Sequence, residues 1–412
     1  MVENQKRLGL TGPQWSWAFY DFANSAFATT VMAGFFPIFF KAFWAKDLPV
    51  TQSTFILGAA NSLSSLLLVL IILALGRRAD KKAQRKKFLA FTTLFACVAT
   101  ASLSLVPQGS VALSALIYVA GALNFGLSLA FYDALLMEVA REGELDWVSG
   151  AGYALGYLGG GILFLINVAM TLKPSFFGLE GPAQAVQWSF VTVAAWWILF
   201  SLPLFRFTKE TAPQADASDL KLKEIFAHLK KQKAMGLFLL AFLFYNDAVN
   251  TIVKMAVDYG SALGFESSDL IKALLLVQFI GFPAALLMGA LGNKWGPVKG
   301  IYLCIGIYIV GTFLAQRMST ITHFYMLATM IGLVQGGVQS LSRSYYARFV
   351  PKDEGATYFG IFNLSGKFSA ILGPALMGAV AWATGSSRAS LLVVIAFFFI
   401  GLVFLRKSQL AK

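Results

Sequence analysis

Long apolar runs separated by short polar segments make up almost the whole chain. Each run is close to the ~20 residues that a helix needs to cross a bilayer. The pattern predicts an all-α membrane protein with twelve transmembrane helices, at residues 15–43, 53–75, 87–106, 111–137, 148–172, 186–205, 234–261, 270–291, 298–316, 321–345, 357–382 and 388–405. Little of the 412-residue chain is left for a soluble domain.

The composition excludes a soluble fold. Apolar residues make up 58% of the chain and charged residues 13%, with a mean hydropathy of +0.69, whereas soluble domains carry about 45–50% and about 25%. The first run is too long and too polar for a signal peptide and should remain as the first span. Cys97 and Cys304 lie within apolar runs, so we expect them to be packed side chains without a disulfide or a metal.

The net charge of +13 indicates how the chain is oriented in the membrane. Most Lys and Arg residues fall in alternate loops, above all in segments 77–87 and 206–233, on the side that holds both termini. This bias predicts a multi-pass protein of the cell's inner membrane with both termini in the cytoplasm. Nucleic-acid binding is not expected, because no basic stretch is interleaved with aromatic residues.

The longest polar stretch, residues 207–233, divides the chain into two units. Residues 1–206 and 234–412 each hold six predicted spans, so the stretch is expected to be a cytoplasmic linker between two six-helix bundles. Its second part, 219–231, fits either a basic amphipathic helix on the membrane surface or a solvated linker.

The two units repeat each other. Asp21-Phe-Ala-Asn24-Ser25 in the first span is echoed by Asp247-Ala-Val-Asn250-Thr251 in the seventh. The loop at 76–86, after the second span, is echoed at 289–299, after the eighth. Two echoes in the same order indicate a duplicated six-span unit, an architecture of transporters whose substrate site lies near the midplane.

The loop after the second span carries a family likeness. Gly76, Asp80, Arg85 and Lys86 resemble the signature of the major facilitator superfamily. Segments 20–31, 245–251, 332–344 and 363–374 resemble its "unknown major facilitator" branch, which is related to the vacuolar amino-acid effluxers. The resemblance implies two pseudo-symmetric six-helix halves and a transport cycle, and it assigns no solute.

Two positions depart from the pattern of that family. Ala83 and Gln84 stand where a Gly-Arg pair is usual, and Asn293 replaces the acid of the second loop. We therefore expect the loop of the second half to contribute less to gating.

Polar and charged side chains recur on one face of four spans. An ionisable group at the centre of a membrane helix costs about 2.5–3.5 kcal/mol on insertion scales, so each needs a reason. Helical spacing places these residues on common stripes: Asp21, Asn24, Ser25 and Ala28 in span one; Asn124, Ser128 and Tyr132 in span four, with Asp133 beside them; Asp247, Asn250, Thr251, Lys254 and Asp258 in span seven; Gln335, Gln339, Ser342 and Arg343 in span ten. The stripes predict a solute or proton pathway, although any one member could equally make an interhelical hydrogen bond. The family resemblance implies that these four spans line a central cavity.

Span eleven carries the least expected charge. Lys367 lies about ten residues into it, one turn after Asn363. A buried ammonium needs a partner, and Asp247 is the first choice, with Asp21 second. The lysine could anchor a substrate carboxylate or phosphate, exchange partners during transport, or form a fixed ion pair; these readings stay open.

Two further features predict how the halves contact each other. Asp80 follows span two and is expected near the N-terminus of span eleven, at 355–357, where a helix dipole favours an anion. Gly76, Asp80 and Arg85 would then form a gate. Small residues recur every four positions, a spacing that lets helices approach closely, at Gly152, Gly156 and Gly160 in span five and at Gly281, Ala285 and Gly289 in span eight. This predicts that spans five and eight pack across the division between the halves.

No constellation of an enzyme is present. His228 and His323 are far from any ligand set, and there is no motif for nucleotide hydrolysis, so no metal or cofactor is expected. The sequence favours a secondary transporter, acting as a monomer, that moves a small polar or zwitterionic solute such as an amino acid and is driven by protons carried on membrane carboxylates. A lipid or drug exporter is the alternative in the same class. A non-transporting membrane receptor is the alternative from another class.

Overall fold

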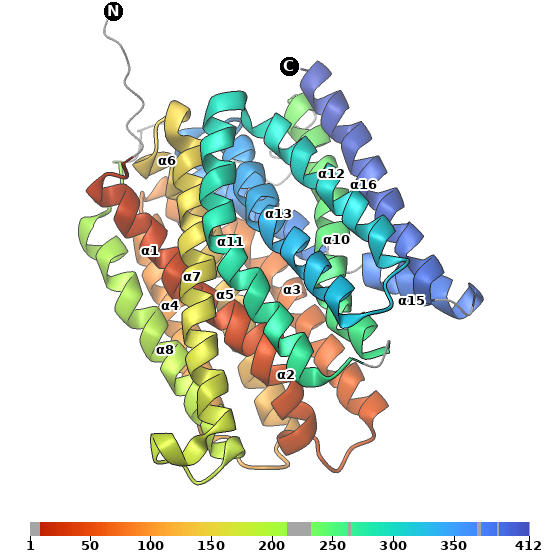
Figure 1. Ribbon diagram of the computed structural model, residues 1–412. Helices are drawn as coiled ribbons and strands as arrows, with labels where there is room; N and C mark the ends of the chain where they lie inside the picture. The colour runs from red at the N-terminus through yellow and green to blue at the C-terminus, as the bar shows by residue number, and fades with distance from the viewer. Residues whose placement is uncertain (1–8, 212–231, 263–264, 369–371, 385–386, 412) are drawn as a thin grey trace, which may run out of the picture.

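A computed structural model describes residues 9–211, 232–262, 265–368, 372–384 and 387–411 of the chain. Within these ranges the protein is a bundle of long, roughly parallel helices joined by short turns, without a strand (Figure 1). Large apolar side chains such as Leu66, Leu70 and Phe95 are more than half exposed on the outside of the bundle, as expected for a surface in contact with lipid.

The helices before the linker, which we call the first half, correspond to the six spans predicted there. They are α1 (Gly12–Ala26), η1 (Phe27–Phe35), α2 (Phe36–Phe39), η2 (Phe40–Trp44), α3 (Val50–Lys81), α4 (Arg85–Ser102), η3 (Leu103–Leu105), α5 (Val111–Ala134), α6 (Leu136–Val139), η4 (Glu142–Glu144), α7 (Leu145–Leu172), η5 (Pro174–Phe177) and α8 (Pro182–Phe207). The first four form one span, in which η1 and η2 are π-helical. Pro37 lacks a backbone N–H and crowds the preceding turn, which favours such a widened helix.

The helices after the linker form the second half. They are α10 (Lys233–Ala262), α11 (Ser267–Trp295), α12 (Pro297–Ala315), α13 (Ile321–Ala347), η6 (Lys352–Glu354), α14 (Gly355–Phe368), α15 (Leu372–Thr384) and α16 (Ser387–Leu410). Over the described residues, eleven helices are long and apolar enough to cross a membrane. Helices α14 and α15 occupy the predicted eleventh span. The expected linker helix at 219–231 lies outside the described residues.

Several helices extend beyond the apolar runs that predicted them. The run at 53–75 belongs to α3, which continues as helix to Lys81. Hydropathy marks the part of a helix that lies in lipid, whereas the helix ends where its backbone hydrogen bonds end. The extra turns matter, because they carry Gly76 and Asp80 out to the end of the bundle.

The start of α1 and the end of α16 lie on the same side of the bundle (Figure 1). We call this side the terminal face. The halves touch where α7 packs against α11 and α13, and where α14 packs against α3 and α5. At the α7–α11 contact a Cβ added at Gly150 would lie 2.8 Å from the Cα of Gly289, so the two backbones approach as closely as two glycines allow.

Candidate functional site

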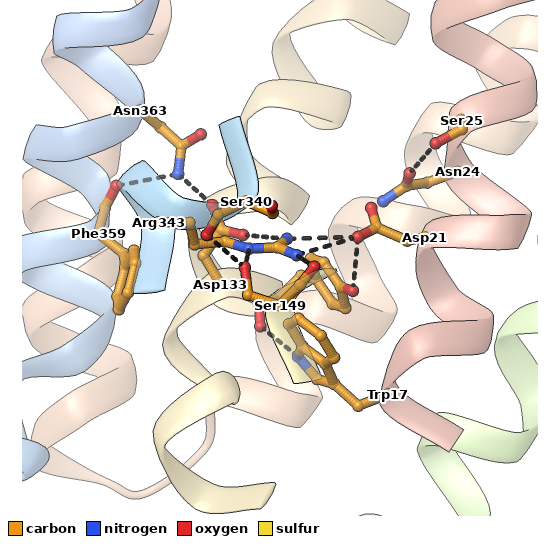
Figure 2. Close-up of polar contacts among 11 residues, drawn as sticks. Trp17, Asp21, Asn24, Ser25, Asp133, Ser149, Ser340, Arg343, Phe359 and Asn363 are labelled. Atoms are coloured by element: carbon orange, nitrogen blue, oxygen red, sulfur yellow. Dashed lines mark hydrogen bonds and ion pairs between the residues drawn. The ribbon is translucent and has the colours of Figure 1, made fainter. Parts of the chain in front are cut away.

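A buried arginine joins the two halves. Arg343 of α13 is 2% exposed, and its guanidinium lies between carboxylates of two helices of the first half (Figure 2). Its Nη1 is 3.3 Å from Asp21 Oδ2 on α1 and 3.1 Å from Asp133 Oδ1 on α5. Nε and Nη2 donate to the side-chain and backbone oxygens of Ser149 on α7, at 2.9 and 3.0 Å. The guanidinium therefore contacts three helices of the other half.

Aromatic rings surround the same guanidinium. Its central carbon is 4.7 Å from the ring centre of Trp17, 5.5 Å from Tyr132 and 4.4 Å from Tyr153, within the ~6 Å range of cation–π attraction. Trp17 and Tyr132 stack at 4.5 Å, and the Tyr132 hydroxyl donates to Asp21 at 2.9 Å. The Arg343 cluster is defined here as Trp17, Asp21, Tyr132, Asp133, Ser149, Tyr153 and Arg343.

The second half adds one more contact to the Arg343 cluster. Asn363 of α14 donates to Oδ2 of Asp133 at 2.9 Å and to the carbonyl oxygen of Phe359 at 3.0 Å (Figure 2). At ~1.5 Å per residue, Asp21 lies about 14 Å from the start of α1, and Arg343 about 6 Å from the end of α13. The cluster thus ties the halves together between the terminal face and the middle of the bundle.

Glycines of α7 make room for this cluster. A Cβ at Gly152 would lie 2.8 Å from Asp21 Oδ2 and 3.0 Å from Arg343 Nη2, so a larger residue would displace the ion pair. In the same way, Gly156 faces Ser25 of α1, and Gly160 faces Thr29 of η1. On the predicted stripe of span five, Gly156 and Gly160 thus face the first span of their own half, and Gly152 also faces Arg343 of the second half.

The contact across the halves uses other positions of the same helix. Gly150 meets Gly289, and Gly281 of α11 lies against Tyr157. Spans five and eight do pack together as predicted, but through a different face of α7. An i, i+4 repeat identifies a face and leaves open which neighbour that face meets.

Asp80 lies near the start of span eleven, as predicted from the sequence. Its carboxylate accepts hydrogen bonds from the backbone nitrogens of Ala356 and Thr357, at 3.0 and 2.9 Å, and from the Thr357 hydroxyl at 2.7 Å. These are among the first residues of α14, so the predicted contact with the start of span eleven is confirmed. Gly76 permits it, because an added Cβ would lie 3.1 Å from the Cα of Thr357. The gating role stays a prediction.

Arg85 extends this contact to a second loop. The buried guanidinium pairs with Asp80 at 2.7 Å and with Glu138 at 2.9 Å, and donates to the carbonyl oxygen of Lys352 at 2.7 Å. Glu210, at the start of the linker, accepts a hydrogen bond of 2.6 Å from the backbone nitrogen of Arg85. Partial burial raises the pKa of the Glu210 carboxyl above its usual value. Contacts of Asp80 and Arg85 thus join α3, α4, α6 and the start of α14 on one side of the terminal face.

A second ion pair between the halves was missed. Arg348, which caps the end of α13, binds Asp146 in the first turn of α7 through two contacts of 2.9 Å, and Ser344 of α13 donates to the same carboxylate. Asp146 is 1% exposed. The echo loop has Asn293 in place of an acid, and here the acid stands on the facing helix. The signal was an acidic residue at a helix start opposite a basic one, a common pattern near any membrane surface.

Other predicted site residues lie deeper in the bundle. Asn24 is 2% exposed, and its amide nitrogen has no hydrogen-bond partner among the described residues. Gln339 donates to Asn246 of α10 at 2.6 Å, which links spans seven and ten. Asn250 and Gln335 are half-buried on the same two helices.

The remaining charged residues of the predicted pathway are Asp247, Lys367 and Lys254. Asp247 is buried and accepts hydrogen bonds of 3.0 Å from the backbone nitrogen of Gly373 in α15. Lys367 is half-buried, with its ammonium 6.0 Å from the ring centre of Phe125. Asp21, the second choice as its partner, pairs with Arg343 instead; a pair with Asp247 stays a prediction. The side chain of Lys254 lies outside the described residues.

Known proteins are similar in sequence to this chain. A family model described as "Vacuole effluxer Atg22 like" matches residues 46–146 and 137–412. The "Uncharacterized MFS-type transporter YxiO" of Bacillus subtilis is 35% identical over 398 residues, which cover 95% of this chain and 93% of that protein. Autophagy-related protein 22 of Yarrowia lipolytica is 24% identical over 62% of this chain and about half (49%) of its own length.

Solved structures share the fold. The fucose:proton symporter FucP of E. coli superposes with a TM-score of 0.74, covering 96% of this chain and 97% of its own at 14% identity. The human organic anion transporter MFSD10 gives a TM-score of 0.70, covering 97% and 99%, also at 14% identity. At such identity the likeness speaks for the fold alone.

Proposed function

The chain belongs to the Atg22-like vacuole effluxer family of major facilitator superfamily transporters, and we propose that it moves a small polar or zwitterionic solute, an amino acid or similar metabolite, by proton-coupled alternating access. The family membership confirms the resemblance read from the sequence, and the fold is that of the superfamily, with twelve helices in two pseudo-symmetric halves. The protein is a multi-pass membrane protein and not an enzyme. The identity of the solute, the coupling to protons and the transport mechanism are what we propose.

The observation that carries the proposal is the Arg343 cluster. It consists of buried side chains from both halves, which lie between the terminal face and the middle of the bundle. Alternating access requires contacts of this kind, which hold one side shut and can be exchanged for others. Its two carboxylates and one guanidinium leave a formal charge of −1, and a buried unpaired charge is costly. A proton taken up by Asp21 or Asp133 would remove that charge and weaken the hold on Arg343.

The gate on the same side supports this reading. Asp80, Gly76 and Arg85 hold the start of α14 against α3, while Asp146 and Arg348 hold α7 against α13. We take the terminal face to be cytoplasmic, because the Lys and Arg residues gather in the loops on that side, and the membrane to be the cell's inner membrane. The solute-accessible side would then be the opposite one in this conformation.

The solute itself would bind among the polar side chains of α1, α10, α13 and α14. Asn24, with an unpartnered amide nitrogen, and the Gln339–Asn246 pair offer neutral donors and acceptors. Lys367 would hold a carboxylate. Such a set suits a zwitterion better than an apolar drug or lipid. We expect the transporter to work as a monomer.

Reconstitution into proteoliposomes tests the proposal. The wild type should exchange labelled solutes from an amino-acid pool, and an imposed pH gradient should drive their accumulation. Asp133→Asn should retain exchange but lose pH-driven accumulation, because it removes a titratable group of the cluster. Asp353→Asn, a charge change of the same kind in the loop before α14, serves as the control. Absence of exchange across amino-acid and other metabolite pools would contradict a transport function.

A further inference from the structure

Among the described residues, every group that binds the Arg343 guanidinium comes from the first half, and the cation itself comes from the second. We propose that these groups, Trp17, Asp21, Tyr132, Asp133, Ser149 and Tyr153, form a cation box that binds a solute bearing an ammonium or guanidinium group when the halves separate at the terminal face. Arg343 would then be a built-in occupant that the solute replaces. The inference rests on the alternating access proposed above and narrows its substrate class.

The geometry of the box is that of a site for an organic cation. Three rings present faces within 4.4 to 5.5 Å of the guanidinium carbon, and aromatic faces of this kind are a known means of binding ammonium groups. The edges of the cation meet two carboxylates and both oxygens of Ser149. Charge, π faces and neutral acceptors are thus combined around one small volume.

The box is held together without Arg343. Trp17 donates through its indole nitrogen to the carbonyl oxygen of Tyr132 at 3.0 Å and stacks on its ring. Tyr132 donates to Asp21 and also stacks on Tyr20, whose hydroxyl is 2.7 Å from that of Thr93. These contacts lie within the first half, so Trp17, Asp21 and Tyr132 should keep their arrangement when the second half moves away. Asp133 and Ser149 would then also lose their hydrogen bonds to Asn363 and to the Ser340 carbonyl oxygen.

Withdrawal of Arg343 would leave two carboxylates close together in the box, without the cation that both bind in this structure. Like charges at close range disfavour each other, so the pair favours a proton or another cation in its place. Protons could neutralise the carboxylates, but they would leave the ring faces and the Ser149 carbonyl oxygen without a cation or donor. An organic cation satisfies all of these groups at once.

Arg348 provides a contrast on the same helix. It also reaches across to an acid of the first half, with two contacts to Asp146. Within the described part of the chain, no aromatic ring lies over its guanidinium at cation–π distance. The aromatic lining is therefore a property of the Arg343 position and not of an inter-half ion pair in general.

Chemical rescue tests the inference. Arg343→Ala in lipid nanodiscs should gain thermal stability on addition of methylguanidinium chloride, saturably, beyond the effect of potassium chloride at equal ionic strength. Arg348→Ala, the matched control, should show no saturable gain. Adding Trp17→Ala to Arg343→Ala should weaken the apparent affinity at least tenfold, whereas Trp17→Phe should weaken it less. Equal gains for Arg343→Ala and Arg348→Ala, or a gain for Arg343→Ala from low pH alone, would overturn the cation box.

A measurement on a chain with Arg343 intact covers the case in which Arg343→Ala does not fold. Ser340, which is buried where the halves meet, is the labelling position. In the Ser340→Cys variant, with Cys97 and Cys304 replaced by alanine, agmatine should increase labelling by an impermeant maleimide in a saturable way. An unchanged labelling rate would overturn the inference. Neither assay requires transport. If neutral solutes are transported and no cation binds, the cation box is refuted while the transport function stands. Cation binding without transport of any solute would support the box and contradict the transport function.

Discussion

Asp80→Asn is the sharpest test of the gate. The change keeps the size of the side chain but removes its charge and turns one oxygen into an NH₂ group. That group would face a backbone N–H of Ala356 or Thr357, or the guanidinium of Arg85, all of which are donors. We therefore expect the start of α14 to lose its hold on α3 while the rest of the bundle stays folded.

The contacts set the size of the effect. A charge near an exposed helix end is worth about 0.3–1 kcal/mol, but Asp80 is 7% exposed and its bonds are charge-assisted. Hydrogen bonds to charged groups contribute about 1.5–3 kcal/mol. The 3–5 kcal/mol expected for breaking a buried ion pair is too high here, because Arg85 keeps Glu138 and the Lys352 carbonyl oxygen. A loss of about 1.5–3 kcal/mol shifts the equilibrium toward the open terminal face by about ten- to a hundredfold.

Cysteine labelling measures this shift. Ser340→Cys is placed in a chain whose natural cysteines, Cys97 and Cys304, are replaced by alanine, and modification by an impermeant maleimide reports opening. Asp80→Asn should raise the rate at least tenfold. Asp353→Asn, which removes a nearby charge outside the gate, should leave it unchanged. Equal rates in the Asp80→Asn variant and its parent would refute the reasoning.

Three further outcomes follow from the same contacts. Gly76→Ala should open the gate as Asp80→Asn does, because the added Cβ would lie 3.1 Å from the backbone of Thr357. Gly58→Ala on the same helix is the control, because nothing lies within 4 Å of its Cβ. Similar labelling rates of the two variants would contradict the close packing at Gly76. Gly150→Val should lower the melting temperature by several degrees, since backbone of α11 blocks the new side chain, and a wild-type melting curve would count against that contact. If Lys367 and Asp247 exchange partners, their double neutralisation should restore folding but not pH-driven accumulation; full accumulation by the Lys367→Ala, Asp247→Asn variant would show a fixed ion pair.

Several residues of the site could be predicted from the sequence, because burying a charge in a membrane is costly. Asp21, Asp133 and Arg343 stood out because an ionisable residue in an apolar run needs a reason, and all three meet in one cluster. Asp80 could be placed against α14 because a helix start offers unpaired N–H groups to an acid. In both cases a costly group, a buried charge or an unpaired N–H, needs a partner, and few residue types can provide one.

Pairing between helices could not be derived in the same way. Helical spacing shows which residues share a face, but the rotation and tilt of each helix decide what that face meets. The sequence allowed Asp21 as a partner of Lys367, whereas in the structure Asp21 pairs with Arg343 of α13. Asp146 and Arg348 were overlooked because charges near a helix end also serve as membrane anchors, and their contact depends on how α7 and α13 cross.

The central claim is that the Arg343 cluster holds the terminal face shut and that its rupture opens it. Arg141 and Lys299 are exposed and lie one in each half. Double electron–electron resonance between spin labels at these positions measures the distance between the halves in nanodiscs. The wild type should show mainly one short distance, and Arg343→Gln should shift most of the population to a longer one. A folded Arg343→Gln protein with the wild-type distance distribution would contradict the account.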